Sequence, residues 1–547
     1  MAGSVATIMD YPLTLNHLLG RMREVYPTRE IVSQRPDKSV LRQTYAEICE
    51  RAEKLARALV QAGVKKGDRV ATLAWNHSAH LECYYGIPAA GGVMHTLNLR
   101  LGPADIGYIA THAEDRIVIV DDVLLPLYDQ FKDRMPAHRT VVIPFGGPVP
   151  DGMESYEDFI ETGDPATELP DIDETDGCAM CYTSGTTGDP KGVIYSHRGM
   201  VLHSMVGAQP DMLNFSMNDC ILPVVPMFHA NAWGIPYAAT MTGAKLVFPG
   251  PHLDPDSLIA QFIGEKVTFS GGVPTVWLGI IQTIEKDPAK YEALRGLRTV
   301  VGGSAAPPAL IRRFQDFGIT VLHAWGMTEM SPLGTVANVK PHLAGQGDEI
   351  YFDYRSKQGY AAPFVDLRHR DGDGNILPWD GESMGELEVR GPWIASSYFN
   401  YPEAGDRWSD DGWFRTGDIV TMDSEGYVQI TDRSKDVIKS GGEWISSVDL
   451  ENAIMGHPAV KEAAVIALPH TKWDERPLAC IVLKDGASLT KAELDGHLLN
   501  DFAKWQLPDD IVVIDEVPKT STGKFQKLSL RNRFADWQWG ADARMAG

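Results

Sequence analysis

Apolar and polar positions follow a helical period in the segment "TYAEICERAEKLARALVQAG", which covers residues 44–63. Thr44 stands three residues before Glu47, a spacing typical of a capping box, in which each side chain satisfies a backbone amide of the first turn. The apolar positions that share one stripe of the expected helix are Ile48, Ala52, Leu55, Ala56, Leu59 and Val60. The pattern therefore predicts an amphipathic helix that follows Thr44 and ends at Gly63.

Short β-branched runs recur between helical stretches farther along the chain. They are "RIVIVDD" from Arg116, "TVVI" from Thr140, "CILPVV" from Cys220, "KLVF" from Lys245, "VTF" from Val267, "RTVVGG" from Arg298 and "ITVLHAWG" from Ile319. Strands that alternate with helices indicate layered α/β architecture with largely parallel sheets.

The pattern changes after about residue 340 to glycine turns and alternating strands, as in "DGDGNILP" and "GELEVRGP", which favours a small antiparallel or barrel-like β region. Beyond "QITDRSKDVIKSGGEWIS" lies a piece of roughly 110 residues with helical and strand signals, long enough for an independent domain. We therefore predict an α/β fold: a large N-terminal domain of layered α/β sheets plus the barrel-like region, then a small α+β C-terminal domain.

Length and charge narrow the class of protein. A chain of 547 residues suggests roughly three to four folding units, and 44% apolar with 22% charged residues is ordinary for a globular protein. The net charge of −23 disfavours binding to nucleic acid and to anionic membranes. No apolar run is long enough for a membrane span, and the N-terminus lacks a basic region followed by an apolar stretch. We expect a cytoplasmic protein with no membrane span and no nucleic-acid partner.

The cysteines do not form a disulfide or zinc pattern. They are scattered at Cys49, Cys83, Cys178, Cys181, Cys220 and Cys480. Only "CAMC", residues 178–181, invites a redox or metal interpretation, but residues three apart on a strand point to opposite faces. The sequence therefore predicts buried structural thiols.

The stretch "YTSGTTGDPKG", residues 182–192, is the strongest chemical signal in the chain. Short hydroxyl side chains and glycines let backbone amides surround an anion, and Lys191 adds a positive charge, so the loop is typical of a phosphate cradle. It is not a P-loop, because Gly192 follows Lys191 where that pattern requires Ser or Thr.

Seven segments in order resemble the motifs of the acyl-adenylate-forming superfamily, which includes acyl-CoA synthetases, luciferases and the adenylation domains of peptide synthetases. They are "YTSGTTGDPKG" at 182, "PMFHANAWG" at 226, "VGGSAAP" at 301, "WGMTEMSP" at 325, "WFRTGD" at 413, "DRSKDVIKSGGEWIS" at 432 and "PKTSTGK" at 518. The resemblance covers nearly the whole length. It implies that a carboxylate attacks the α-phosphorus of ATP, that pyrophosphate leaves, and that the thiol of coenzyme A then displaces AMP.

The same resemblance assigns residues to the nucleotide. Glu329 is the implied Mg2+ ligand, Thr328 contacts the α-phosphate, and Asp418 with Arg433 holds the ribose. Trp325 stands where the family usually has a tyrosine that stacks on adenine. The full set of implied nucleotide-binding residues is Thr183, Ser184, Gly185, Thr186, Thr187, Gly188, Lys191, Gly303, Ser304, Ala305, Trp325, Gly326, Met327, Asp418 and Arg433.

The family rotates its small domain between the two half-reactions, so the resemblance also implies a division of the chain. Residues 1–432 form the large N-terminal adenylate-forming domain, 433–435 the hinge with Lys435, and 436–547 the small mobile C-terminal domain that carries the catalytic Lys524. In the second half-reaction Lys439, Gly441 and Gly442 face the site and leave a passage for the pantetheine arm of coenzyme A.

The acid is the least defined substrate. Amino-acid-activating relatives have an aspartate at the position of His229, so an amino acid is not expected here. The implied catalytic residues are Lys524, Glu329, Thr328 and His229, and the implied acid-binding residues are His229, Trp233, Gly302, Gly303, Trp325 and Pro332. Trp233 resembles the gate residue of a fatty acyl-CoA synthetase branch. Within that branch, the motifs "PMFHANAWG", "GGVPTVWLG" and "VVGGSAAP" resemble those of bacterial ligases for 3-(methylthio)propionate. The bulky side chains of Trp233 and Trp325 suit an acid with a short chain.

Other functions stay open at this point. A medium- or long-chain fatty acyl-CoA ligase is the main alternative, and a luciferase-like oxygenase shares the adenylation machinery. A carrier-loading adenylation module should have a fused carrier segment, and we expect none. A silent adenylate-binding regulator should lack Glu329, Asp418 or Lys524, and all three are present. Relatives in this branch are often homodimers through the large domain, and we expect the same here.

Overall fold

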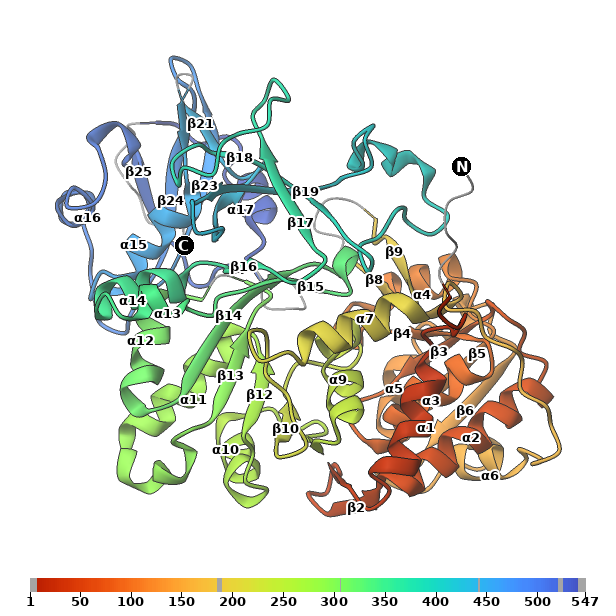
Figure 1. Ribbon diagram of the computed structural model, residues 1–547. Helices are drawn as coiled ribbons and strands as arrows, with labels where there is room; N and C mark the ends of the chain where they lie inside the picture. The colour runs from red at the N-terminus through yellow and green to blue at the C-terminus, as the bar shows by residue number, and fades with distance from the viewer. Residues whose placement is uncertain (1–6, 184–188, 305, 441–442, 520–524, 540–547) are drawn as a thin grey trace.

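The computed structural model describes residues 7–183, 189–304, 306–440, 443–519 and 525–539, and within these residues the chain forms four β-sheets (Figure 1). Two large sheets come from the first two thirds of the chain, and two smaller sheets follow. None of the helices in the described ranges is long and apolar enough to cross a membrane. The mixed α/β architecture with a large first part and a smaller terminal part confirms the predicted fold class.

The first large sheet has seven strands in the order β7-β6-β5-β3-β4-β8-β9 among the described residues. The strands are β3 (Arg69–Leu73), β4 (Val93–Thr96), β5 (Ile117–Asp121), β6 (Arg139–Ile143), β7 (Glu154–Ser155), β8 (Gly177–Tyr182) and β9 (Gly192–Ser196). All neighbours are parallel except β8 and β9, which form an antiparallel pair on either side of the 183–191 loop. The predicted phosphate cradle therefore lies in the connection between these two antiparallel strands at the sheet edge.

The second large sheet has nine strands in the order β16-β15-β14-β13-β12-β10-β11-β1-β2 among the described residues. They are β1 (Glu30–Gln34), β2 (Val40–Thr44), β10 (Cys220–Pro223), β11 (Lys245–Phe248), β12 (Phe269–Gly272), β13 (Arg298–Val301), β14 (Thr320–Gly326), β15 (Leu333–Val336) and β16 (Tyr360–Ala361). The strands from β14 to β1 are parallel, and β2, β15 and β16 add antiparallel edges. The prediction of largely parallel sheets is confirmed.

Several predicted runs differ from the observed strands by a few residues at their ends, most of all the run from Val267. The run from Val267 was expected to be a strand, but β12 starts at Phe269 and continues to Gly272. Lys266 has a left-handed φ of 56°, and the Thr268 hydroxyl donates to Asp219 at 2.7 Å. The chain therefore turns into the sheet at residues 266–268, before regular pairing begins.

Helices connect the strands and cover both large sheets (Figure 1). Those of the first part are α1 (Leu15–Val25), α2 (Tyr45–Gln61), α3 (Ser78–Ala89), α4 (Pro103–His112), α5 (Leu125–Tyr128), α6 (Tyr156–Glu161), α7 (His197–Gly207), α8 (Ala230–Trp233), α9 (Ile235–Thr242), α10 (Pro255–Gly264), α11 (Pro274–Lys286), α12 (Pro308–Phe317), α13 (Pro341–Ala344) and α14 (Asp348–Ser356). The helix predicted from the opening pattern is α2. Both hydrogen bonds of its capping box form between Thr44 and Glu47, and its apolar stripe is buried except for half-buried Val60.

The third sheet is the predicted antiparallel region. It contains β17 (Asp366–Arg370), β18 (Gly385–Arg390), β19 (Phe414–Met422) and β20 (Val428–Arg433), each antiparallel to the next. The glycine turn "DGDGNILP" lies between β17 and β18. In Figure 1 these strands lie between the two large sheets and the terminal region.

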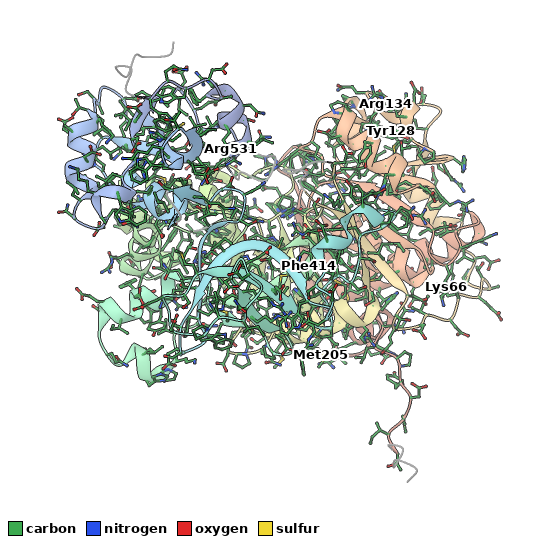
Figure 2. All side chains as sticks on the ribbon, turned by 90° about the horizontal axis from the view of Figure 1, so that it is seen from above. Lys66, Tyr128, Arg134, Met205, Phe414 and Arg531 are labelled. Carbon is green, nitrogen blue, oxygen red and sulfur yellow. The ribbon has the colours of Figure 1, made fainter. Side chains whose placement is uncertain are left out.

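The fourth sheet belongs to the terminal region. It is formed by β21 (Ile438–Ser440), β22 (Glu443–Ile445), β23 (Val460–His470), β24 (Asp474–Leu483) and β25 (Asp510–Val513), and its helices are α15 (Ser447–Met455), α16 (Lys491–Leu498) and α17 (Lys527–Arg533). The chain leaves the third sheet at Arg433 and enters the fourth at Ile438. Figure 2 shows this region, marked by Arg531, on the side of the molecule opposite the lobe that carries Arg134.

The six cysteines are free and buried, as predicted. Cys178 and Cys181 both lie on β8, but the thiol of Cys178 donates to the backbone oxygen of Tyr195 at 3.3 Å, while that of Cys181 donates to the Asn231 side chain at 2.8 Å. Burial raises the pKa of the Cys178 and Cys181 thiols, so both remain protonated donors near neutral pH. The two sulfurs serve separate contacts and do not form a joint site.

Candidate active site

The stem of the predicted phosphate loop is closed by two hydrogen bonds. The amide of Thr183 donates to the carbonyl oxygen of Lys191 at 2.9 Å, and the amide of Lys191 donates to the Thr183 hydroxyl at 3.1 Å. Ser184, Gly185, Thr186, Thr187 and Gly188 lie outside the described residues. The stem thus fixes where the loop begins and ends, directly beyond β8 and β9.

Lys191 lies against two aromatic rings from a distant segment. Its Nζ is 5.0 Å from the ring centre of Tyr401 and 5.9 Å from that of Tyr398. The segment is held to the hairpin by a hydrogen bond from the Phe399 amide to the Gly192 oxygen at 2.9 Å. A Cβ atom at Gly192 would lie 2.4 Å from the terminal methyl of Met180 and 2.9 Å from the Tyr182 ring, so a side chain there would require both to shift.

Tyr398 also contacts the predicted magnesium ligand. Its hydroxyl donates to Oε1 of Glu329 at 2.6 Å, so one side chain joins Lys191 on the phosphate hairpin to Glu329 on the loop after β14. Burial and the nearby Glu329 carboxylate raise the pKa of Tyr398, which keeps the hydroxyl protonated. The structure therefore brings a cation and a carboxylate, 138 positions apart in the chain, to the same tyrosine.

The backbone around Glu329 is fixed on both sides. The Tyr195 hydroxyl donates to the Thr328 oxygen at 2.7 Å, and the Ala395 amide donates to the Glu329 oxygen at 2.7 Å. The Glu329 residue is only 5% exposed. Its carboxylate suits a hard divalent cation, which in phosphoryl-transfer sites uses one or two carboxylates together with phosphate oxygens and waters. Among the described residues no group of three or more His, Cys, Asp or Glu is placed to hold a metal ion.

Trp325, Asp418 and Arg433 form one interaction chain. The indole Nε1 of Trp325 donates to Oδ2 of Asp418 at 2.9 Å, and Nε of Arg433 lies 2.7 Å from Oδ1 of the same carboxylate. Asp418 and Arg433 are direct cross-strand partners on β19 and β20. A carboxylate has about four lone-pair sites, so Asp418 retains acceptor capacity for ribose hydroxyls. These residues fit the nucleoside half of ATP.

The ring of Trp325 packs closely on backbone. A Cβ atom at Gly334 would lie 2.7 Å from the ring, so only glycine allows this approach. At Gly326 a Cβ atom would lie 1.9 Å from the Pro332 oxygen, and the Met327 amide donates to that oxygen at 3.1 Å. The loop from Gly326 to Pro332 is therefore folded tightly back on itself beside Trp325.

The predicted acyl side is built from glycines and one indole. Cβ atoms added at Gly302 and Gly303 would lie 3.4 Å and 3.9 Å from the ring of Trp233, and one at Gly271 would lie 3.8 Å from it. Gly303 has a φ of 83°, which a side chain would strain. The Trp233 ring thus lies over the carboxyl ends of β12 and β13, the edge where open α/β sheets bind ligands. Ser304, which follows, is exposed.

Trp233 is carried by an unusual backbone turn. In α8 the φ angles of Ala230, Asn231, Ala232 and Trp233 are 41°, 52°, 50° and 58°, all in the left-handed region. Each such residue costs about 1–2 kcal/mol unless it is glycine, with asparagine better tolerated than most. His229 precedes the turn and is half-buried, and its carbonyl accepts the Ala232 amide at 3.0 Å.

Some predicted site residues are not brought to this centre or cannot be placed. Lys439 is exposed on β21, and its amide donates to Glu475 at 2.8 Å within the terminal region. Ala305, Gly441, Gly442 and Lys524 lie outside the described residues.

Sequence reasoning missed the side chains that hold the motifs together. Tyr398, Tyr195 and the pair of Cys181 with Asn231 connect segments that are far apart in the chain. Tyr195 and Asn231 lie within or beside recognised motifs, but Tyr398 follows the featureless stretch "WIASS". No spacing rule identifies a residue whose partners are separated from it by tens of positions.

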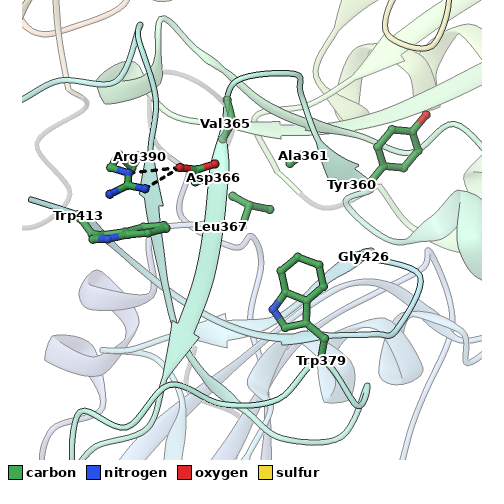
Figure 3. Close-up of a pocket in the computed structure, with 9 residues that line it drawn as sticks. All are labelled: Tyr360, Ala361, Val365, Asp366, Leu367, Trp379, Arg390, Trp413 and Gly426. Carbon is green, nitrogen blue, oxygen red and sulfur yellow. Dashed lines mark hydrogen bonds and ion pairs between the residues drawn. The ribbon is translucent and has the colours of Figure 1, made fainter. Parts of the chain in front are cut away.

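A hollow of about 480 Å3 in the antiparallel region lies apart from these residues (Figure 3). It contains none of the predicted site residues. Its lining includes Trp379 and Leu367, and at one end Arg390 pairs with Asp366 at 2.8 Å and lies over Trp413. Its two charged lining residues pair with each other, and the motif residues remain the better candidate site.

Comparison with known proteins places the chain among enzymes of one type. The sequence profile described as "AMP-binding enzyme" matches residues 23–399, and that described as "AMP-binding enzyme C-terminal domain" matches residues 449–524. A long-chain-fatty-acid–CoA ligase of Thermus thermophilus is 48% identical over 98% of this chain and 98% of its own length.

A 3-methylmercaptopropionyl-CoA ligase of Ruegeria pomeroyi is 44% identical over 97% of this chain and 98% of its own length. Among solved structures, that of ATP-bound MatB from Rhodopseudomonas palustris is similar, with a TM-score of 0.81, 28% identity, and coverage of 96% of this chain and 99% of that one. These similarities extend over both the large and the terminal parts of the chain.

Proposed function

Because the chain belongs to the AMP-binding enzyme family and is an AMP-forming acyl-CoA ligase, we propose that its acid is a short carboxylic acid of the 3-(methylthio)propionate type. The observation that carries this proposal is the Trp233 indole, which lies over Gly271, Gly302 and Gly303 where the acyl group is expected. A bulky ring at this position shortens the space available beyond the carboxylate. The Ruegeria relative, whose name specifies that acid, supports the same choice.

A second candidate has a specific observation in its favour. The Thermus relative, which has the higher identity, is named a long-chain-fatty-acid–CoA ligase. A single change in the orientation of Trp233 would lengthen the acyl side and admit such acids. The choice between short and long acids therefore depends on one side chain.

We assign nucleotide-binding roles to the described residues by matching the charge of each side chain to a part of ATP. Arg433 and Asp418 hold the ribose, and Trp325 orients the Asp418 carboxylate through its indole N–H. Lys191 would hold phosphate oxygens beside its loop, and Glu329, whose carboxylate accepts a hydrogen bond from Tyr398, would hold Mg2+. A bound Mg2+ ion supplies charge neutralisation on the phosphates.

The proposed chemistry has two steps: a carboxylate oxygen attacks the α-phosphorus of ATP and pyrophosphate leaves, and then the sulfur of coenzyme A attacks the carboxyl carbon and AMP leaves. ATP provides the leaving group that an ordinary carboxylate lacks, and coenzyme A provides the thiol that displaces AMP. In the first step the ammonium group of Lys524 contacts the α-phosphate and the attacking carboxylate and stabilises their negative charge. This role rests on its position in "PKTSTGK". His229 and Trp233 bound the acid on the side opposite the nucleotide.

We also propose that the two parts of the chain move against each other about Lys435, within a hinge at residues 433–435. The chain passes from the third to the fourth sheet between Arg433 and Ile438, a span that includes these residues, which supports the position. The terminal region then presents Lys524 for the first step and the segment of Lys439, Gly441 and Gly442 for the second.

The acid is tested by comparing kcat/KM for coenzyme A-dependent AMP release among butyrate, 3-(methylthio)propionate, hexanoate, octanoate and laurate. We expect the highest value for 3-(methylthio)propionate or another short acid. A maximum with laurate would replace the short acid by the long-chain alternative. AMP release that does not depend on coenzyme A with any acid would instead favour an oxygenase of the luciferase type.

A further inference from the structure

The left-handed turn α8 is tied to the other large sheet by a buried hydrogen bond. The thiol of Cys181, on β8 of the first sheet, donates to Oδ1 of Asn231, the second residue of the turn, at 2.8 Å. The turn itself follows β10 of the second sheet. Asn231 is 0% exposed and Cys181 1%, so water does not compete for either partner.

A second contact holds the residue that leads into the turn. The Thr96 hydroxyl, at the end of β4, donates to the carbonyl oxygen of Phe228 at 3.2 Å and lies 3.4 Å from the Cys181 sulfur. Thr96 gives its one proton to Phe228 and can only accept from Cys181, while the shorter contact of the thiol is its donation to Asn231 at 2.8 Å. Neighbouring strands β4 and β8 therefore fix the chain at Phe228 and Asn231.

At the far end of the turn, the backbone of Gly234 lies close to the ring of His203. A Cβ atom at Gly234 would lie 2.6 Å from the His203 ring, and Nε2 of His203 accepts the Leu333 amide at 3.1 Å. A run of left-handed residues persists only where the surroundings over-determine it. Here the determining contacts are Thr96 and Cys181 on one side and His203 on the other.

We propose that Asn231 and Cys181 are positioning residues that set the length of acid this enzyme accepts. Their hydrogen bond holds the turn in its left-handed form, and the turn holds the Trp233 indole over Gly302 and Gly303. Without the bond the turn relaxes toward ordinary backbone angles, the indole leaves the carboxyl ends of β12 and β13, and longer chains enter. The inference rests on the proposed function, because it takes the Trp233 ring as the boundary of the acyl group.

The test compares two substitutions of Cys181. Cys181→Ala removes the donor, whereas Cys181→Ser keeps a hydroxyl donor of similar size and serves as the matched control. The quantity measured is the ratio of kcat/KM for octanoate to that for butyrate. We expect Cys181→Ala to raise this ratio about tenfold, a typical effect of a change in an apolar pocket, and Cys181→Ser to leave it within about twofold.

Asn231→Gly tests the other partner. Glycine adopts left-handed angles freely, so the backbone remains allowed and only the side-chain amide is lost. We expect the same rise in the ratio as for Cys181→Ala, with no further rise in the double variant, because both changes remove one bond. In a Trp233→Ala background, Cys181→Ala should no longer change the ratio, because the effect acts through the indole.

The KM for ATP and the melting temperature separate positioning from a general structural role. The proposal holds if the ratio rises in Cys181→Ala and Asn231→Gly while the KM for ATP stays within about twofold of the unaltered enzyme. It is overturned if both variants melt at lower temperature with an unchanged ratio, or if Cys181→Ser shifts the ratio as much as Cys181→Ala. The ratio in each variant is compared with the ratio in the unaltered enzyme. If the unaltered enzyme prefers long acids, the proposed substrate is wrong, but the change in the ratio still tests the roles of Cys181 and Asn231.

Discussion

The nucleotide side and the acyl side of the candidate site are built by different physical means. On the nucleotide side, charged and polar side chains from distant segments contact each other directly, as in the chain of Trp325, Asp418 and Arg433. On the acyl side, the boundary is glycine backbone covered by the indole of Trp233. The turn that carries Trp233 is held by the hydrogen bond from Cys181 to Asn231. The first arrangement fits one constant ligand, whereas the second can be changed by moving a single ring. We therefore propose that the nucleotide is specified by many contacts and the acid by few.

The largest expected effect concerns Lys524, the residue proposed to act in the first half-reaction. Lys524→Ala should lower the rate of acyl-adenylate formation by about a thousandfold, the scale typical for loss of one transition-state charge contact. Thioester formation from supplied acyl-AMP should continue, because the lysine is assigned to the first step only. Pyrophosphate exchange and thioester release, measured separately, check this. An equal loss in both half-reactions would show that the assigned role is wrong.

The acyl side should be the more acid-sensitive of the two. Burial lowers the pKa of His203 to about 4 from an ordinary 6.5, and its Nε2 must stay unprotonated to accept the Leu333 amide. As pH falls from 6.5 toward 4, the unfolded chain binds a proton at this residue that the folded protein does not. The free energy of unfolding should therefore fall by about 3 kcal/mol over this range from His203 alone.

His203→Gln is the matched control for that pH dependence, since glutamine keeps an acceptor but does not titrate. Burial also lowers the pKa of His80 to about 3 and of His197 to about 4, so part of the slope should remain in the variant. Denaturant unfolding at several pH values measures the difference. An identical slope in the variant and the unaltered protein would remove His203 from the explanation.

A substitution on the nucleotide side should lower kcat/KM for ATP and leave the preference among acids unchanged. Asp418→Ala removes the acceptor of both Trp325 and Arg433, and we expect kcat/KM for ATP to fall about a hundredfold, as for loss of charge-assisted hydrogen bonds. The ratio between octanoate and butyrate should not change. Asp366→Ala, which removes an exposed ion pair with Arg390, should leave both quantities unaltered. A changed acid ratio in Asp418→Ala would mean that the two sides are not independent.

The smallest expected effect is at the tyrosine between the phosphate loop and Glu329. Tyr398→Phe keeps the ring beside Lys191 but removes the hydrogen bond to Glu329, and should lower adenylation about fivefold, mainly at low Mg2+ concentration. Tyr398→Leu removes the ring contact as well and should cost more. Titration of the rate with Mg2+ measures both. A loss in Tyr398→Phe that is the same at all Mg2+ concentrations would separate Tyr398 from the metal.

Individual helices and strands could be predicted from the sequence because capping residues and the spacing of apolar positions favour them locally. The capping box at Thr44 and Glu47 and the β-branched runs at 117–121 and 139–143 predict their elements, since each depends on neighbours a few positions away. The start of β12 was missed because Thr268 bonds to Asp219 and to the Cys220 oxygen of the adjoining strand, which are distant in the chain. The seven motifs likewise identify the type of enzyme through short spacings.

By itself, the order of residues predicted the helix after Thr44, the alternation of helices with largely parallel strands and, through seven motifs, the type of reaction. Only the tertiary structure decided that Tyr398 joins Lys191 to Glu329, that Trp325 engages Asp418, and that Cys181 holds the turn of Asn231. Periodicity and capping depend on a few neighbouring residues, whereas these contacts arise when strands from different sheets are packed together. Their partners are chosen by that packing, which no spacing along the chain encodes.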